Sequence, residues 1–180
     1  MPTHLDEPLP YLTGHLSGIG GVIRSTPEDF RVEEQPLYLP CGQGEHLYLS
    51  ITKCGLSTPQ MVSKLSSTLG VKAQGIGVAG LKDARAVTTQ MMSVHGATPE
   101  LIAKLTPDEQ LLSITVLGRH RNRLRPGHHS GNRFRLVIRK TEPSASAVVP
   151  QILDELAKRG VPNYFGPQRQ GREGTNFEVG

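Results

Sequence analysis

The chain has 180 residues, enough for one domain with a hydrophobic core. Its net charge of +4 is modest, and with four Phe, four Tyr and no Trp the core must consist mainly of aliphatic residues. The 20 Gly and 14 Pro indicate many turns between short elements rather than a helical bundle. We expect no membrane span, no secretory signal and no disulfide framework, and therefore a cytoplasmic protein.

Alternating apolar and polar residues predict the strands of the first half of the chain. Strands are expected over residues 22–23, 30–33 and 47–52. A helix follows, with Thr58 expected as its N-cap, Pro59 at the first helical position and Gly70 at its end. A short apolar run over residues 76–79 predicts a buried strand that delivers the next residues to its exit loop.

The second half continues this succession of short elements. Thr98 and Pro99 predict the start of a short helix over Leu101, Ile102 and Leu105, and a last helix is expected over residues 148–158, ending at Gly160. Its inward residues are expected to be Val149, Ile152, Leu153 and Leu156. Further strands are predicted over residues 90–94, 112–117 and 134–138. The order of elements predicts an α/β (α+β) domain with a largely antiparallel mixed sheet flanked by helices.

One stretch, residues 80–90, combines charged and polar residues after the buried run. Asp83 lies between Lys82 and Arg85, and two flanking cations favour the ionised form of a carboxyl group. An ionised carboxylate in such a setting can act as a nucleophile toward an electrophilic carbon. A surface turn with solvated charges explains the same residues, so the stretch alone indicates a site without establishing one.

A basic block covers residues 119–140, which contain eight of the 20 Lys and Arg residues, three His and no acidic residue. Such a block suits binding to a phosphate backbone and predicts salt-sensitive binding. A solvated basic hairpin is the alternative. The basic residues do not distinguish RNA from DNA, although the chain shows neither a helix-turn-helix nor a zinc-finger pattern.

Cofactor and metal motifs are weak. Gly75, Gly77 and Gly80 match the dinucleotide-binding glycine spacing, but no clear strand precedes them and a charged loop follows. The seven His and two Cys show no ligand spacing, and the adjacent His128 and His129 cannot easily share one ion. We expect neither a cofactor nor a metal.

The pattern Gly80, Lys82, Asp83, Thr88 and Gln90 resembles the signature of the TruD-type tRNA pseudouridine synthases. The resemblance extends over about residues 20 to 176 and preserves the order of the family's motifs. Those further blocks are residues 27–33, 42–46, 51–53 with Thr58, 119–120, 124–127, 131–134 and 160–169.

The resemblance implies a pseudouridine-synthase-like catalytic core that isomerises a uridine of tRNA, at position 13 in the bacterial family, without a cofactor. Asp83 matches the catalytic carboxylate. The expected partner is tRNA, and neither a membrane nor a protein partner is implied. The expected substrate-binding residues are Phe30, Lys82, Asn132 and Phe134, and the expected RNA-binding residues are Arg85, Arg119, His120 and Arg125.

The family's members are considerably longer than this chain. Residues 1–180 are therefore expected to match the N-terminal portion of the catalytic domain, without the inserted domain and the C-terminal half, and to be at most weakly active alone. The alternative is a non-catalytic tRNA-binding remnant. The sequence departs from the family's usual residues at Gln170 and at residues 128–130, which alters the lip of the site and leaves Asp83 unchanged.

Overall fold

The computed structural model describes residues 11–161, and these form two compact units. The larger unit is Val22–Arg139. Residues 11–21 and 140–161 belong to the smaller unit. The residues of interest all lie in the larger unit, apart from one end of the basic block.

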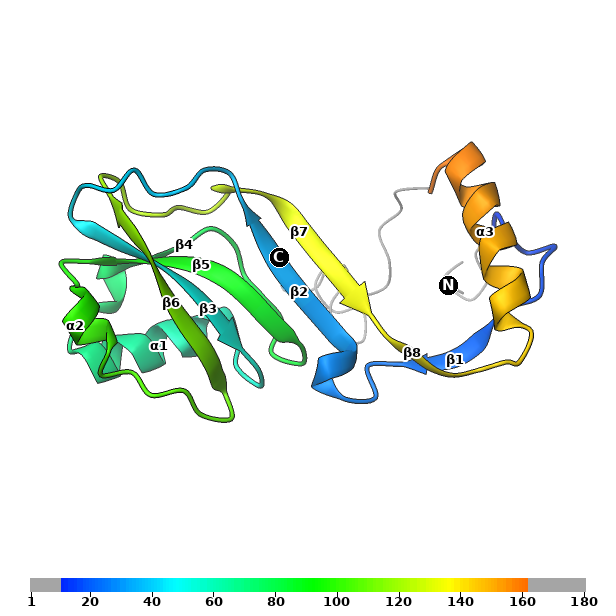
Figure 1. Cartoon of the computed structure of the whole chain (residues 1–180), viewed down its shortest axis with the longest axis horizontal. Helices are drawn as coiled ribbons and strands as arrows, with labels where there is room; N and C mark the ends of the chain where they lie inside the picture. The colour runs from blue at the N-terminus through cyan, green and yellow to red at the C-terminus, as the bar shows by residue number, and fades with distance from the viewer. Residues whose placement is uncertain (1–10, 162–180) are drawn as a thin grey trace, which may run out of the picture. The chain divides into compact units, whose positions relative to one another are not determined.

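The larger unit contains a six-stranded sheet in the order β6-β3-β5-β2-β7, with β4 paired to β5 (Figure 1). Of its pairings, β2 with β5 is parallel and the others are antiparallel. This confirms the predicted mixed, largely antiparallel sheet. The strands are β2 (Phe30–Pro36), β3 (His46–Lys53), β4 (Ile76–Val78), β5 (Val87–His95), β6 (Leu111–His120) and β7 (His129–Leu136).

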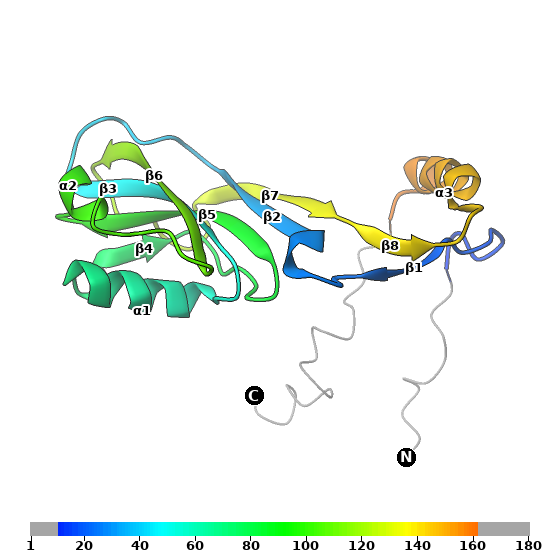
Figure 2. The same cartoon turned by 60° about the horizontal axis from the view of Figure 1, so that its bottom comes forward.

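The core lies between one face of this sheet and the helix α1 (Thr58–Leu69), which runs along the sheet in Figure 2. The alternation in β3 directs Leu49 and Ile51 into the core, where they meet Met61 and Leu65 of α1 with no exposed surface. The short helix α2 (Pro99–Ile102) joins the same core through Ile102. No helix within residues 11–161 is long and apolar enough to cross a bilayer.

The start of α1 and the end of α2 differ from those predicted, and α3 (Ala145–Arg159) begins at Ala145 rather than at residue 148. Ser57, not Thr58, caps α1: its hydroxyl accepts a hydrogen bond from the backbone of Gln60, and the Gln60 side chain accepts one from the Ser57 backbone at 2.8 Å. Both residues can cap a helix, and the sequence alone could not show that Thr58 is drawn into a buried contact. Thr98 caps α2 as predicted. The helix ends at Ile102, before Leu105, although Leu105 is buried as expected of a core residue.

Strand β7 begins five residues before the predicted start, and its pairing with β2 gives the reason. The two strands are in register from Phe30 opposite Leu136 to Gln35 opposite Gly131, and a register shift then sets Pro36 opposite His129. The pairing therefore extends β7 well beyond its apolar residues (Figure 1). Hydrogen bonds of the ladder, rather than burial, define this strand, because most of its side chains are exposed.

The remaining elements are β1 (Gly20–Ile23) and β8 (Ile138–Thr141), which form a two-stranded sheet, and α3 (Ala145–Arg159). Two single 3-10 turns, η1 (Pro27–Asp29) and η2 (Ala73–Gly75), precede β2 and β4. Helix α3 ends at Gly160 as predicted. Its expected inward residues are half-buried except Leu153, whose 60% exposure shows that prediction to be wrong. Residues 11–18 line a hollow on the side of α3 that carries Ile152, and Leu153 does not line it.

Candidate active site

The candidate nucleophile Asp83 lies in the loop between β4 and β5. A hydrogen bond from the Gly55 amide to the Ala84 carbonyl, at 3.0 Å, ties the loop to the segment between β3 and α1. Asp83 is exposed, whereas its neighbour Lys82 is buried. The loop therefore presents one charged side chain outward and directs the other into the protein.

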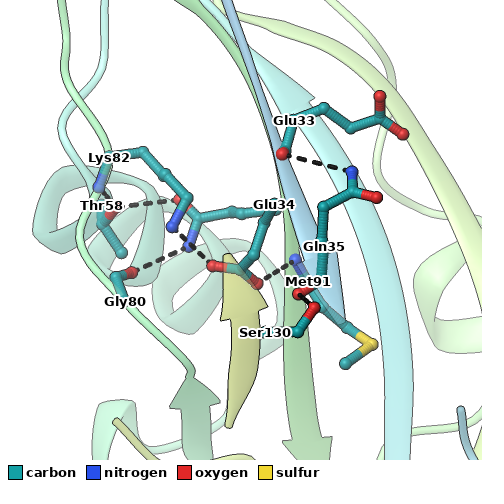
Figure 3. Close-up of polar contacts among 9 residues, drawn as sticks. Glu33, Glu34, Gln35, Thr58, Gly80, Lys82, Met91 and Ser130 are labelled. Atoms are coloured by element: carbon teal, nitrogen blue, oxygen red, sulfur yellow. Dashed lines mark hydrogen bonds and ion pairs between the residues drawn. The ribbon is translucent and has the colours of Figure 1, made fainter. Parts of the chain in front are cut away.

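A buried ion pair anchors this loop to β2. The Lys82 ammonium lies 2.6 Å from a carboxylate oxygen of Glu34, and the two side chains are 4% and 1% exposed (Figure 3). The second oxygen of Glu34 accepts a hydrogen bond from the Met91 backbone of β5 at 3.0 Å. The sequence suggested Lys82 as a cation flanking Asp83, but its ammonium forms an ion pair with Glu34 instead.

The backbone of the same loop is held by uncharged groups. The Lys82 amide donates to the Thr58 hydroxyl at 2.8 Å, and this hydroxyl donates to the side-chain oxygen of Gln90 at 2.8 Å. Figure 3 shows Thr58 beside the ion pair of Lys82 and Glu34, with Gly80 at the start of the loop. A Cβ on Gly80 would lie 3.2 Å from the Lys82 ammonium and 3.3 Å from the His129 ring, so only glycine fits without displacing them.

The residues expected to bind substrate meet at one pocket of about 410 Å³. The Phe30 and Phe134 rings are stacked with their centroids 6.0 Å apart and an interplanar angle of 9°, and the Arg24 guanidinium lies 4.2 Å from the Phe30 centroid. The pocket also takes in Leu81, which is exposed. Its lining residues are Phe30, Val32, Ser57, Leu81, Lys82, Asp83, Ala84, Asn132 and Phe134.

The register of β2 and β7 brings these side chains to one face of the sheet. Val32 lies opposite Phe134, and Glu34 lies opposite Asn132. Side chains of residues two apart share a face, so Phe30, Val32 and Glu34 all face the loop of Asp83. Two aromatic rings and an amide can hold a planar base, and the exposed carboxylate beside them can then approach that base.

The expected RNA-binding residues do not form one group. Arg85 is exposed and lines a separate hollow near Arg24. The Arg119 guanidinium donates to the backbone carbonyls of Gly44 and Ala97, at 3.4 and 3.3 Å. His120 accepts a hydrogen bond from the Cys41 backbone and stacks on Tyr38. The structure thus gives Arg119 and His120 contacts within the protein.

Arg125 differs from these two because it is exposed and its guanidinium makes no hydrogen bond or ion pair within residues 11–161. Only its backbone amide donates, to the His128 ring at 3.4 Å. Elsewhere in the basic block, Arg123 donates to the Ile76 carbonyl at 2.6 Å. Arg139 makes a bidentate contact with Asp29, which lowers the pKa of that carboxyl group below its usual value. Charge density along the sequence therefore overstates how many of these residues are available to a ligand.

Several residues that build the site had no assigned role. Glu34, Gln90 and Lys53 are buried and polar, and each contacts the loop of Asp83 or its anchor. Their signal in the sequence was membership of the shared motif blocks or, for Glu34, a position next to one. The matching block over residues 160–169 lies, apart from its first two residues, outside the described residues. Within residues 11–161, no group of three or more His, Cys, Asp or Glu side chains is placed to hold a metal ion.

The buried ion pair supports a stability prediction. Replacing Glu34 by Gln leaves the buried Lys82 ammonium without a counter-charge, which should lower the free energy of unfolding by about 3–5 kcal/mol. The double variant Glu34→Gln/Lys82→Met removes the stranded charge and should regain part of this loss. Urea denaturation measures each value.

The matched control is Glu33→Gln on the same strand, where the exposed carboxylate lies 3.7 Å from Arg133. An exposed pair contributes at most about 1 kcal/mol, so this change should be small. A Glu34→Gln variant as stable as Glu33→Gln would contradict the assigned role of the buried pair.

Comparison with known proteins bears on the whole chain. The family model described as "tRNA pseudouridine synthase D (TruD)" matches residues 9–180. Proteins named tRNA pseudouridine synthase D are 44% identical in Geotalea daltonii, over 95% of this chain and 43% of theirs, and 48% identical in Geobacter sulfurreducens, over 94% and 41%. The one from Thermus thermophilus is 46% identical over 94% of this chain and 47% of its own length.

A solved structure agrees with these matches. The crystal structure described as that of a tRNA pseudouridine synthase D from Methanosarcina mazei superposes with a TM-score of 0.86 at 34% identity, over 95% of this chain and 40% of that one. The chain spans less than half the length of the curated relatives described above. Because the family model covers nearly all of its residues, the chain belongs to the TruD family of tRNA pseudouridine synthases.

Proposed function

We propose that this chain provides the nucleophile-bearing part of a tRNA pseudouridine synthase, which converts uridine to pseudouridine at position 13 of tRNA. Asp83 is the catalytic carboxylate in this proposal. The observation that carries it is the pocket, where Asp83 meets Phe30, Asn132 and Phe134 from distant parts of the sequence. Membership of the TruD family supports the same reaction.

The chemistry is an isomerisation and needs no external oxidant or reductant. The bond between N1 of uracil and C1′ of ribose breaks, the base rotates, and a bond from C5 to C1′ forms. The proton on C5 leaves to solvent, and N1 gains one. Asp83 acts by attacking C6 of the base or C1′ of the sugar, or by removing the 2′ proton. Confining the detached base beside the sugar gives the proximity that recapture requires.

The surrounding groups have roles that follow from their chemistry. Phe30 and Phe134 offer aromatic faces to a uracil that has left the helical stack, and the Asn132 amide can donate to and accept from its polar edge. Lys82 acts on this site by fixing the loop through Glu34. Lys82 also lines the pocket, so it can contact the substrate.

The relatives are named for action on tRNA, and we propose tRNA as the partner of this chain, in the cytoplasm. We further propose that residues 1–180 supply the N-terminal portion of a catalytic domain. The fraction of the relatives that the chain covers supports this reading. Turnover by the 180-residue chain alone is accordingly expected to be weak.

The second candidate is a non-catalytic module that binds tRNA through its basic residues. The exposed Arg125, together with Arg121 and Arg135, favours binding to a phosphate backbone. The two candidates differ in what Asp83 does. If the chain is a non-catalytic module, replacing Asp83 by an uncharged residue changes neither tRNA binding nor any reaction.

The test is release of tritium from C5 of labelled uridine in a tRNA transcript, with the chain in excess over tRNA so that slow turnover is visible. We expect release by the unaltered chain and a loss of at least about a hundredfold in Asp83→Asn, because the carboxylate acts in the transition state. Asp154→Asn, an exposed acid on α3, is the control and should retain release.

Equal release by the unaltered chain and by Asp83→Asn would contradict the proposal. No release from either, with binding of tRNA intact, would favour the non-catalytic module.

Arg119, near the end of β6, and Arg125, in the loop between β6 and β7, give a separate prediction on binding. Arg125→Ala should reduce the slope of log K against log salt by about one, because the exposed guanidinium can neutralise a phosphate. Arg119→Ala should leave the slope unchanged and lower stability, because this guanidinium binds two backbone carbonyls. Anisotropy of labelled tRNA across a salt series measures both. Equal slopes for Arg125→Ala and the unaltered chain would contradict the assignment.

A further inference from the structure

Lys53, the last residue of β3, is buried in an environment that is unfavourable for a charged side chain. The side chain has no exposed surface, and none of the ion pairs within residues 11–161 involves it. Its ammonium instead donates to two backbone carbonyls, those of Leu56 at 2.5 Å and Asp83 at 3.4 Å. A buried charge without a counter-charge costs stability, so its presence calls for an explanation.

The two carbonyls belong to segments that meet at the pocket. Leu56 precedes Ser57, which caps α1 and lines the pocket, and Asp83 carries the candidate nucleophile. One ammonium therefore joins the end of β3 to the start of α1 and to the loop after β4. A charged donor makes hydrogen bonds about twice as strong as a neutral one, so this link is stronger while Lys53 is protonated.

We infer that Lys53 is a positioning residue for Asp83, whose main-chain carbonyl it holds so that the carboxylate faces the pocket. The inference rests on the proposed function only for the statement that Asp83 reacts. Lys53 itself touches no substrate. Its action passes through the backbone of the residue that does.

The electrostatics give this contact a pH dependence. Burial is the main cause that lowers the pKa of Lys53 from its usual 10.5 to about 8. The charge of Lys82 lowers it further, while the charges of Asp83 and Cys54 oppose the shift. Its neighbour across the ladder is the uncharged Thr88 of β5, whose buried hydroxyl has no partner within residues 11–161.

The sign of the effect on stability follows from linkage. Between about pH 8 and 10.5 the unfolded chain holds the Lys53 proton and the folded chain has lost it, so stability rises with pH in this window. The contact with Asp83 weakens over the same range. Lys53 is therefore charged at neutral pH at the expense of stability, which is expected of a residue that serves a functional site.

The test follows carbonyl carbons by NMR through a pH titration of the 180-residue chain. The Asp83 carbonyl carbon should titrate with the midpoint of the Lys53 ammonium nitrogen, near pH 8. In Lys53→Met, which has a similar length and no charge, this titration should vanish. Lys104→Met, at an exposed position, should leave it unchanged.

The Leu56 carbonyl separates positioning from a purely structural role. If Lys53 only supports the start of α1, the Leu56 carbon titrates and the Asp83 carbon stays constant, which overturns the inference. Persistence of the Asp83 titration in Lys53→Met overturns it too. If Lys53→Met does not fold, the unaltered chain alone still decides between matching and different midpoints.

Turnover supplies a second and independent readout. In the unaltered chain kcat should fall as the pH rises through about 8, whereas Lys53→Met should have a kcat reduced at least about tenfold at neutral pH and no such step. A pH profile with the same step in both overturns the positioning role. If no tritium is released at any pH, the proposed function fails, and the carbon titration still decides whether Lys53 holds the Asp83 backbone.

Discussion

The buried ion pair between Glu34 and Lys82 is the constraint on which the site depends. Removing two charges from water is expensive, and their attraction offsets the expense only when further hydrogen bonds complete the arrangement. Here the Met91 amide donates a hydrogen bond to the Glu34 carboxylate, and the Thr58 hydroxyl accepts one from the Lys82 amide. The pair therefore fixes the loop relative to both β2 and β5. Asp83 is exposed but directly follows the anchored residue, so the carboxylate proposed to react is presented from a fixed backbone.

Strand register turns this single anchor into a pocket. A shift of β2 by one residue would move Glu34 to the opposite face and strand Lys82, so the ion pair and the register specify each other. The same register sets Phe134 opposite Val32 and Asn132 opposite Glu34. Main-chain pairing thus brings the aromatic rings and the amide to the pocket that Asp83 also lines. This explains how β7 serves the site although most of its side chains are exposed.

The sequence predicted much of this fold, and its errors have physical reasons. Alternation located β3 correctly, because one face of that strand is fully buried. It located β7 poorly, because ladder pairing with β2 rather than burial defines the strand. The resemblance identified the residues that meet at the pocket. Neither the resemblance nor the charges could identify Glu34 as the partner of Lys82. Asp83 is adjacent to Lys82 in the sequence, whereas Glu34 is 48 residues away. Thr58 was mistaken for a cap because its buried contact with Gln90 depends on tertiary structure.

The central claim is that a buried network, not the loop's own sequence, fixes the position of Asp83. Native-state hydrogen exchange of the Lys82 amide tests this most directly, because that amide donates to the buried Thr58 hydroxyl. The account predicts that this amide exchanges only when the whole unit unfolds, with an opening free energy equal to that of global unfolding. Exchange as fast as that of an exposed loop would contradict the account, because it would show the loop opening while the sheet stays folded.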